Sequence, residues 1–102
     1  MKNIVLVCAG GMSTSLLMNK MNDAAAARGD DVRTTAMSVE AFEKYDGPCD
    51  VLLLGPQLSH RKKDLEGRLA DTGIKVALID MMDYGMMNGA KVLDKALELM
   101  GA

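Results

Sequence analysis

The sequence predicts one α/β domain in which four parallel strands alternate with helices. Three mainly apolar runs, at 4–7, 51–54 and 75–79, are typical of strands buried on both faces of a sheet. Segments with apolar residues at helical spacing separate these runs. Strict alternation with short connections favours a parallel sheet with helices on both faces. The length of 102 residues suits a single domain over residues 1–102.

The first strand and the first helix are clearly marked. The first apolar run ends at Cys8, and Gly10 and Gly11 then break the strand. Ser13 is a favourable N-cap, so we expect a helix over residues 13–28. Its apolar positions recur at helical spacing and are Leu16, Leu17, Met21, Ala24 and Ala25.

The second strand differs from the others in composition. Residues 32–37 are more polar and rich in β-branched side chains, which indicates an edge strand. Ser38 can cap a short helix that reaches Tyr45, and Gly47-Pro48 ends that helix.

The second half of the chain repeats the alternation. A helix is expected between the strands at 51–54 and 75–79, and another near the end of the chain. We expect residues 81–87 between them to form a loop. The apolar faces of the two helices are Leu58, Leu65 and Leu69 in the first and Val92, Leu93, Ala96, Leu97 and Met100 in the second.

The predicted topology locates the site before any motif is considered. The strand order 2-1-3-4 puts the polar second strand at an edge. Ligands of such sheets bind beyond the carboxyl ends of the strands, where the strand order reverses. That point lies after the first and third strands, at residues 8–15 and 55–57.

Composition excludes several classes of function. The chain has 12 basic and 14 acidic side chains, a net charge of −2, so no basic excess indicates nucleic acid. The first apolar run is too short for a membrane span, and we expect a cytoplasmic protein that is not itself embedded in a membrane. No His or Cys cluster has metal-ligand spacing, so we expect no metal and no cofactor.

The turn after the first strand carries the candidate chemistry. Gly10 and Gly11 permit a conformation in which successive N–H groups point at one anion above the start of a helix. Hydroxyl groups follow, and no carboxylate in this turn repels a phosphate. We therefore take Cys8 as the nucleophile. The candidate phosphate-binding residues are Ala9, Gly10, Gly11, Met12, Ser13, Thr14 and Ser15.

The same environment is expected to activate the thiol. The pKa of a free cysteine is about 8.5, and helix N-termini can lower it to roughly 3.5–7.5. We therefore expect one loop both to make Cys8 nucleophilic and to bind a phosphoryl group that the sulfur receives. Cys49 precedes the third strand at the opposite end of the sheet, so we expect it to be a small buried filler that does not pair with Cys8.

The run from Cys8 to Leu17 resembles the phosphorylation loop of IIB proteins. These are components of the lactose/cellobiose (chitobiose) family of the bacterial phosphoenolpyruvate-dependent sugar phosphotransferase system. Residues 51–57 resemble that family's third strand and turn, and residues 80–85 resemble its segment after the fourth strand. Ala9 departs from the pattern, because relatives often carry Ser there.

The resemblance implies a fold, an activity and two partners. The fold is similar to that of low-molecular-weight tyrosine phosphatases. A IIA protein donates a phosphoryl group from a histidine to Cys8, and Cys8 passes it to a sugar bound by a membrane IIC permease. Partners should dock around Cys8, on an apolar rim for which Met12 and Leu16 or Leu17 are candidates. The sequence assigns no role to His60, Asp80 or Tyr84, and it does not identify the sugar.

Two alternatives stay open. A phosphatase of low molecular weight has a Cys-x5-Arg-Ser/Thr loop, but Thr14 stands where that loop has Arg. Such an Arg stabilises transition-state charge and is worth 10³–10⁵ in rate in related transfers. A flavodoxin-like binding module, in which the loop holds the phosphate of a ligand and Cys8 only packs, is the non-enzymatic alternative.

Overall fold

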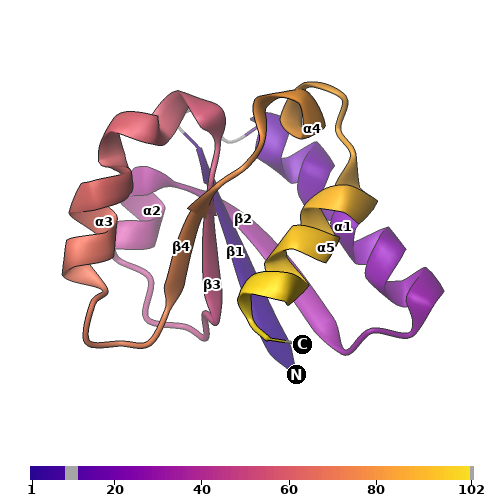
Figure 1. Ribbon diagram of the computed structural model, residues 1–102, viewed down its shortest axis with the longest axis horizontal. Coiled ribbons are helices and arrows are strands. Elements are labelled where there is room, and N and C mark those ends of the chain that lie inside the picture. Colours follow the sequence, from indigo (N-terminus) through magenta and orange to yellow (C-terminus); the bar gives the residue numbers. More distant parts are fainter. Residues whose placement is uncertain (9–11, 102) are drawn as a thin grey trace.

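A single parallel sheet of four strands runs through the molecule. The computed structural model describes residues 1–8 and 12–101, and its strand order is β2-β1-β3-β4, as predicted (Figure 1). All three strand pairings are parallel. The polar second strand lies at one edge, which confirms the interpretation of its composition. The strands are β1 (Lys2–Cys8), β2 (Val32–Ser38), β3 (Val51–Leu54) and β4 (Lys75–Leu78).

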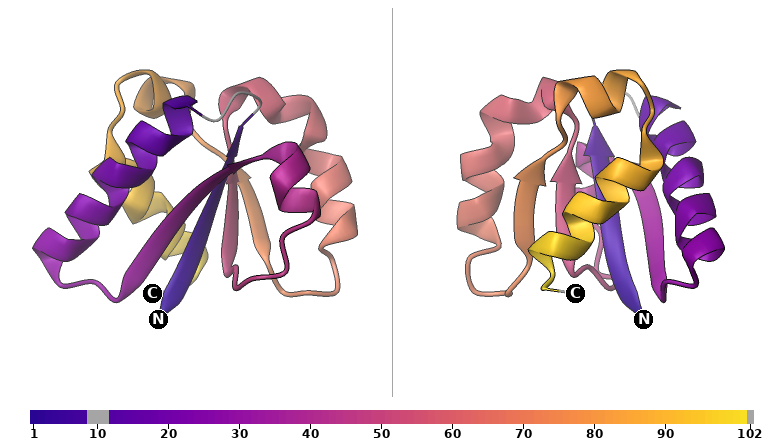
Figure 2. Two further views of the ribbon diagram at one scale, coloured as in Figure 1. Left: turned by 180° about the vertical axis from the view of Figure 1, so that it is seen from behind. Right: turned by 45° about the vertical axis from the view of Figure 1, so that its right-hand side comes forward.

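Helices cover both faces of the sheet. Helices α1 (Met12–Arg28) and α5 (Gly89–Leu99) pack on one face, and α2 (Val39–Glu43) and α3 (Lys62–Arg68) pack on the other (Figure 2). A 3-10 helix, η1 (Pro56–Arg61), leads from β3 into α3.

Each face of the sheet has its own apolar core, because neighbouring residues of a strand point to opposite sides. The short helix α4 (Met81–Gly85) lies on the same side as α1 and α5. The buried side chains between the sheet and these three helices include Ile4, Leu6, Leu17, Met21, Val51, Leu53, Ile79, Tyr84, Val92, Leu93 and Ala96. Those between the sheet and the other helices are Val5, Val7, Val39, Leu52, Leu54, Leu58 and Leu65.

Two predicted elements need correction. Residues 81–87 are not all loop, because α4 spans Met81–Gly85. Helix α1 begins at Met12, so Ser13 lies in its first turn and not at the N-cap. The predicted cap of α2 is confirmed, since the Ser38 hydroxyl accepts a hydrogen bond from the Ala41 N–H at 3.1 Å.

The two ends of the sheet carry different residues. The carboxyl end brings together Cys8 at the end of β1, Gly55 after β3 and Asp80 after β4. The amino end of β1 lies at the opposite side of the molecule, where Met1 and Leu97 of α5 line one shallow hollow. The two chain ends are therefore close together and far from Cys8 (Figure 1).

Candidate active site

Cys8 ends a central strand of the sheet. It lies beside Ser38 of β2, and the Gly55 N–H donates a 2.9 Å hydrogen bond to the Val7 carbonyl on its other side. Cys8 is only 4% exposed. A thiol covered to this extent presents little area to solvent, so a reagent can reach the sulfur only along a restricted direction.

Thr14 contacts the sulfur directly. Its hydroxyl oxygen lies 3.4 Å from Cys8 Sγ, and the Thr14 side chain is completely buried. Either atom donates when Cys8 is a thiol. A thiolate can only accept, so ionised Cys8 receives its hydrogen bond from the Thr14 hydroxyl. The Thr14 hydroxyl is thus placed to stabilise negative charge on the sulfur.

Gly55 permits the end of β3 to approach Cys8. A Cβ atom on Gly55 would lie 3.2 Å from Cys8 Cβ and 2.8 Å from Gln57 Oε1. The ring of Tyr84 borders the same position, with its Cε2 at 3.7 Å. A glycine at residue 55 thus lets the end of β3 lie close to both Cys8 and the Tyr84 ring, at the point where the strand order reverses after β1 and β3.

The structure describes only part of the predicted phosphate loop. Ala9, Gly10 and Gly11 lie outside the described residues, as do the side chains of Met12 and Ser13. Ser15 is exposed in the first turns of α1. That first turn has no acidic residue, so the positive end of the helix dipole faces the Cys8 end of the sheet without a competing carboxylate.

The second cysteine has the opposite character. Cys49 is half-buried just before β3, and its Sγ lies 3.5 Å from the Val51 carbonyl. Burial, together with the neighbouring Asp50 carboxylate, raises the pKa of the Cys49 thiol from 9.0 to about 11. Cys49 therefore stays protonated at neutral pH and is a poor nucleophile.

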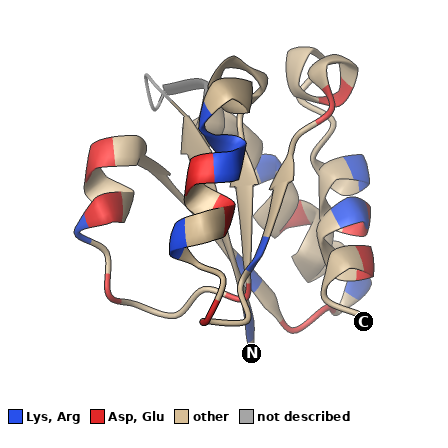
Figure 3. Cartoon of the chain, turned by 60° about the vertical axis from the view of Figure 1, so that its left-hand side comes forward, with Lys and Arg blue, Asp and Glu red and all other residues tan. Residues whose placement is uncertain are grey.

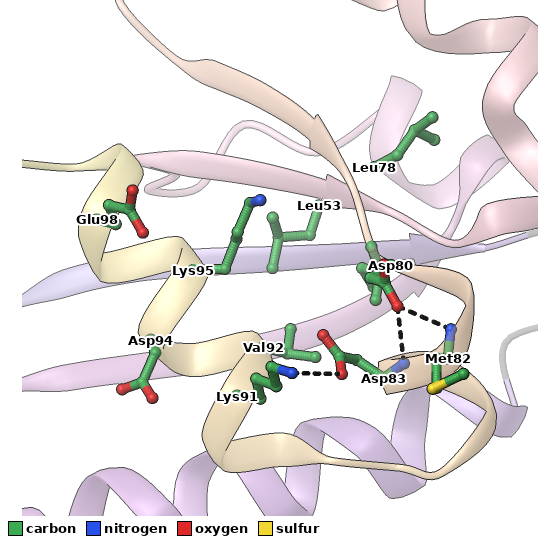
Figure 4. A pocket seen from close by; sticks show the side chains of 11 residues that line it. Leu53, Leu78, Asp80, Met82, Asp83, Lys91, Val92, Asp94, Lys95 and Glu98 are labelled. Carbon is green, nitrogen blue, oxygen red and sulfur yellow. Dashed lines mark hydrogen bonds and ion pairs between the residues drawn. The ribbon is translucent and has the colours of Figure 1, made fainter.

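Helix α4 assigns roles to two residues that sequence reasoning left open. The Asp80 carboxylate caps the helix and accepts hydrogen bonds from the N–H groups of Met82 at 2.9 Å and Asp83 at 3.2 Å (Figure 4). Tyr84 is buried in the core beside α1 and α5. Asp is a favourable N-cap residue, so Asp80 was a sequence signal for the start of a helix, although the five residues that follow show no clear helical periodicity.

One cleft in the described part of the chain lies away from Cys8. It has a volume of about 750 Å³ and opens between α5 and the end of β4 (Figure 4). Its lining includes the apolar residues Leu53, Ile79 and Val92 and several charged side chains. It has no cysteine, histidine or hydroxyl nucleophile in its lining, so we place the reacting group at Cys8 and not in this cleft.

The basic residues after β3 are largely neutralised by their own chain. Arg61 lies 3.4 Å from Glu43 and 3.7 Å from Asp64, and Lys62 lies 3.4 Å from Glu66. His60 is exposed on η1. Among residues 1–8 and 12–101, no group of three His, Cys, Asp or Glu side chains is arranged to hold a metal ion. Within the same described ranges, no helix has the length and apolar character that crossing a membrane requires.

Comparison with known proteins gives full-length matches. A sequence model of the family described as "PTS system, Lactose/Cellobiose specific IIB subunit" matches residues 3–95. The chain is 40% identical over 100 residues to the oligo-beta-mannoside-specific EIIB component of Bacillus subtilis, covering 98% of this chain and 97% of that one. It is 43% identical over 104 residues to the cellobiose-specific EIIB component of Lactococcus lactis, covering 97% and 96%.

Solved structures agree with these matches. The cellobiose-specific IIB component of Borrelia burgdorferi has a TM-score of 0.78 and 36% identity, over 98% of this chain and 92% of that one. The lactose-specific IIB domain of Streptococcus pneumoniae has a TM-score of 0.86 at 22% identity, over 96% of each chain, which shows the shared fold. This chain belongs to the lactose/cellobiose-specific IIB family of the sugar phosphotransferase system.

Proposed function

We propose that this protein is a cytoplasmic phosphoryl carrier that holds the phosphoryl group on Cys8 between a IIA donor and a sugar bound by a membrane IIC permease. The observation that carries the proposal is the Cys8–Thr14 contact of 3.4 Å at the carboxyl end of β1. This contact gives the buried thiol a hydroxyl partner, in a chain that belongs to a family of phosphotransferase-system components.

The first step transfers the phosphoryl group from a histidine of the donor. The Cys8 thiolate attacks phosphorus, the S–P bond forms and the N–P bond to the histidine ring breaks. The electron pair of that bond stays on the ring nitrogen, so no proton is needed from Cys8. Amides of residues 9–15 and the side chains of Ser13, Thr14 and Ser15 hold the phosphate oxygens.

The second step returns Cys8 to its starting state. A sugar hydroxyl attacks phosphorus, the O–P bond forms and the S–P bond breaks. The hydroxyl proton passes to water, and the electron pair of the S–P bond returns to Cys8 as the thiolate. Thiolate is a good leaving group, and the Thr14 hydroxyl is in place to stabilise the charge that returns to the sulfur.

Relatives in which IIB and IIC form one chain support the second partner. The lactose-specific EIICB component of Streptococcus mutans matches 80% of this chain with 30% identity over 82 residues, which is 14% of that longer protein. The other similar proteins are named for β-mannoside, galactose and cellobiose, so we infer a β-linked sugar or galactoside as the class of substrate.

A carrier needs an intermediate that resists water. Thr14 stands where the phosphatase loop carries its Arg, so this site lacks the charge that accelerates hydrolysis. We expect phosphate on Cys8 to persist long enough to meet a second protein. Turnover of an aryl phosphate at the rate of a tyrosine phosphatase would contradict the proposal and assign a hydrolase instead.

The decisive experiment is transfer from a phosphorylated IIA protein followed by peptide mass mapping. We expect one phosphate on Cys8, none in Cys8→Ser, and an undiminished label in Cys49→Ser. A label on any other residue, or a nucleotide or flavin that copurifies with an unlabelled protein, would overturn the proposal.

A further inference from the structure

Gln57 lies beside Cys8 without belonging to the predicted phosphate loop. It follows β3 in η1, at the carboxyl end of the sheet. The side-chain oxygen Oε1 of Gln57 and the Cβ atom of Cys8 border the same point, because a Cβ atom on Gly55 would lie 2.8 Å from the first and 3.2 Å from the second. The Gln57 carboxamide therefore folds back over Gly55 toward Cys8, although the residue as a whole is exposed to solvent.

A fixed turn holds the backbone of Gln57. The Leu58 N–H donates a 2.9 Å hydrogen bond to the Gly55 carbonyl, and the Leu58 side chain is buried in the core beneath α2 and α3. Pro56 restricts the turn further, because its ring fixes the backbone angle φ. Since both neighbours of Gln57 are held in this way, a change of side-chain rotamer is enough to turn its N–H groups toward an atom bound to Cys8.

Other polar side chains that follow the strands near Cys8 already have partners. The Ser38 hydroxyl at the end of β2 accepts a hydrogen bond from the Ala41 N–H, and the Asp80 carboxylate after β4 accepts hydrogen bonds from N–H groups of α4. Within the part of the chain that the structure describes, the Gln57 carboxamide forms no hydrogen bond. Its two N–H groups can therefore donate to a group carried by the sulfur.

The described residues near Gln57 carry few unpaired charges. Residues 56–60 include no Lys, Arg, Asp or Glu, and Figure 3 shows this segment in tan next to the charged start of α3. Arg61, the next residue, forms ion pairs with two carboxylates of its own chain. On α1, the predicted apolar rim is represented by Leu16, which is 50% exposed, and not by Leu17, which is fully buried. A phosphoryl group on Cys8 would thus meet a neutral donor on the η1 side.

We propose that Gln57 is a phosphate-binding residue that contacts the phosphoryl group on Cys8 in both transfers. This inference rests on the proposed function. One N–H of the carboxamide donates to a phosphoryl oxygen, from a segment far in sequence from the loop after β1. Because the carboxamide is neutral, it stabilises the phosphorylated protein without adding the positive charge by which an Arg accelerates hydrolysis. A neutral donor therefore suits a carrier, whose intermediate must persist.

The first test observes Gln57 directly. It is the only glutamine in the sequence, so its side-chain amide can be observed alone in protein labelled with ¹⁵N at that amide. We expect its pair of N–H signals to shift, and to exchange more slowly with solvent, when a phosphorylated IIA protein loads Cys8. An unmoved pair, with Cys8 shown by mass to be phosphorylated, would overturn the inference and leave the proposed function standing. Absence of phosphate on Cys8 would reject both.

Two substitutions of Gln57 separate the hydrogen bond from packing. Gln57→Met keeps the approximate size of the side chain but removes the donor, and it should lower the equilibrium constant for phosphoryl transfer from the IIA protein to Cys8 by roughly tenfold. Gln57→Glu should lower this constant further at neutral pH, relative to the unsubstituted protein. The additional loss should shrink as the pH falls toward about 5, because a protonated carboxyl group no longer repels phosphate. A merely structural role would not produce this pH dependence.

Ser59→Asp is the matched control. Ser59 is exposed on the same 3-10 helix, so this substitution adds one negative charge to the segment while Gln57 is retained. We expect the transfer equilibrium to change by less than about twofold, because solvent and salt screen an exposed charge. Equal losses in Ser59→Asp and Gln57→Glu, or an unchanged equilibrium in Gln57→Met, would overturn the inference.

Discussion

The hydroxyl of Thr14 contacts the Cys8 sulfur, and this contact makes the chemistry of Cys8 depend on a residue six positions further along the chain. The Thr14 side chain is completely buried, and it also makes a polar contact, because its Oγ1 lies 3.4 Å from the sulfur. A hydrogen bond to a charged group contributes about 1.5–3 kcal/mol. We therefore expect the Thr14 hydroxyl to stabilise a thiolate at Cys8.

Thr14→Val removes this hydroxyl and keeps the shape of the side chain. We expect alkylation of Cys8 by iodoacetamide at neutral pH to slow by about threefold to tenfold, with its pH midpoint moved upward. Thr14→Ser retains the hydroxyl and should restore both values. Equal slowing in the two variants would mean that packing, and not the hydrogen bond, controls the sulfur.

The raised pKa of Cys49 predicts how the stability of the fold changes at alkaline pH. Below pH 9.0 both the folded and the unfolded chain keep the Cys49 proton, so its contribution to the free energy of unfolding is constant. Between 9.0 and about 11 the unfolded chain loses that proton and the folded one does not, so stability falls as the pH rises. Urea unfolding at pH 8 and pH 10.5 should show a smaller fall in Cys49→Ala than in the unsubstituted protein; equal falls would contradict the assignment.

At the scale of elements, glycines decide how closely segments approach one another. A methyl group at Gly55 would lie 3.2 Å from Cys8 Cβ, so β3 or Cys8 must shift by a few tenths of an ångström. In contrast, a methyl group at Gly67 on the exposed side of α3 meets open space. The two positions therefore form a matched pair.

We expect Gly55→Ala to slow phosphoryl transfer to Cys8 while lowering stability by only about 1 kcal/mol. Gly67→Ala should leave transfer unchanged and raise stability by roughly 0.5–1 kcal/mol, because alanine favours the helix. Transfer rates from the donor and urea midpoints test both. Normal transfer in Gly55→Ala would show that the close approach at residue 55 has no role in positioning the sulfur.

Most helices and strands could be predicted from the sequence, because the spacing of their apolar residues matches the positions that are buried in the structure. The runs at 4–7 and 51–54 are buried on both faces, and Leu17, Met21 and Ala25 form the inner face of α1. Helix α4 was missed because five residues give too little periodicity and its methionines mostly face solvent. The Thr14 contact was not predictable in its geometry, since sequence spacing does not show which hydroxyl turns toward the sulfur.

At the scale of the whole molecule, one sheet separates two apolar cores. Tyr84 belongs to the core beneath α1 and α5, and Tyr45 packs against the core beneath α2 and α3. The sheet is common to both, so neither core can survive the loss of the other. The chain has no Trp, so each tyrosine can report on one core.

We predict a single cooperative unfolding transition. In Tyr45→Phe the remaining tyrosine is Tyr84, and in Tyr84→Phe it is Tyr45; in each variant the fluorescence and circular dichroism curves in urea should coincide. Leu93→Ala in one core and Leu65→Ala in the other should each cost about 2–5 kcal/mol and move both probes together. Separate midpoints for the two cores would contradict the shared sheet as the source of cooperativity.

The neighbouring positions of the two chain ends, opposite Cys8, have a practical consequence. A fluorophore, an affinity tag or a solid support coupled through either terminus would sit on the far side of the sheet from the thiol. The protein can thus be immobilised in a uniform orientation that leaves its reacting end facing the solution.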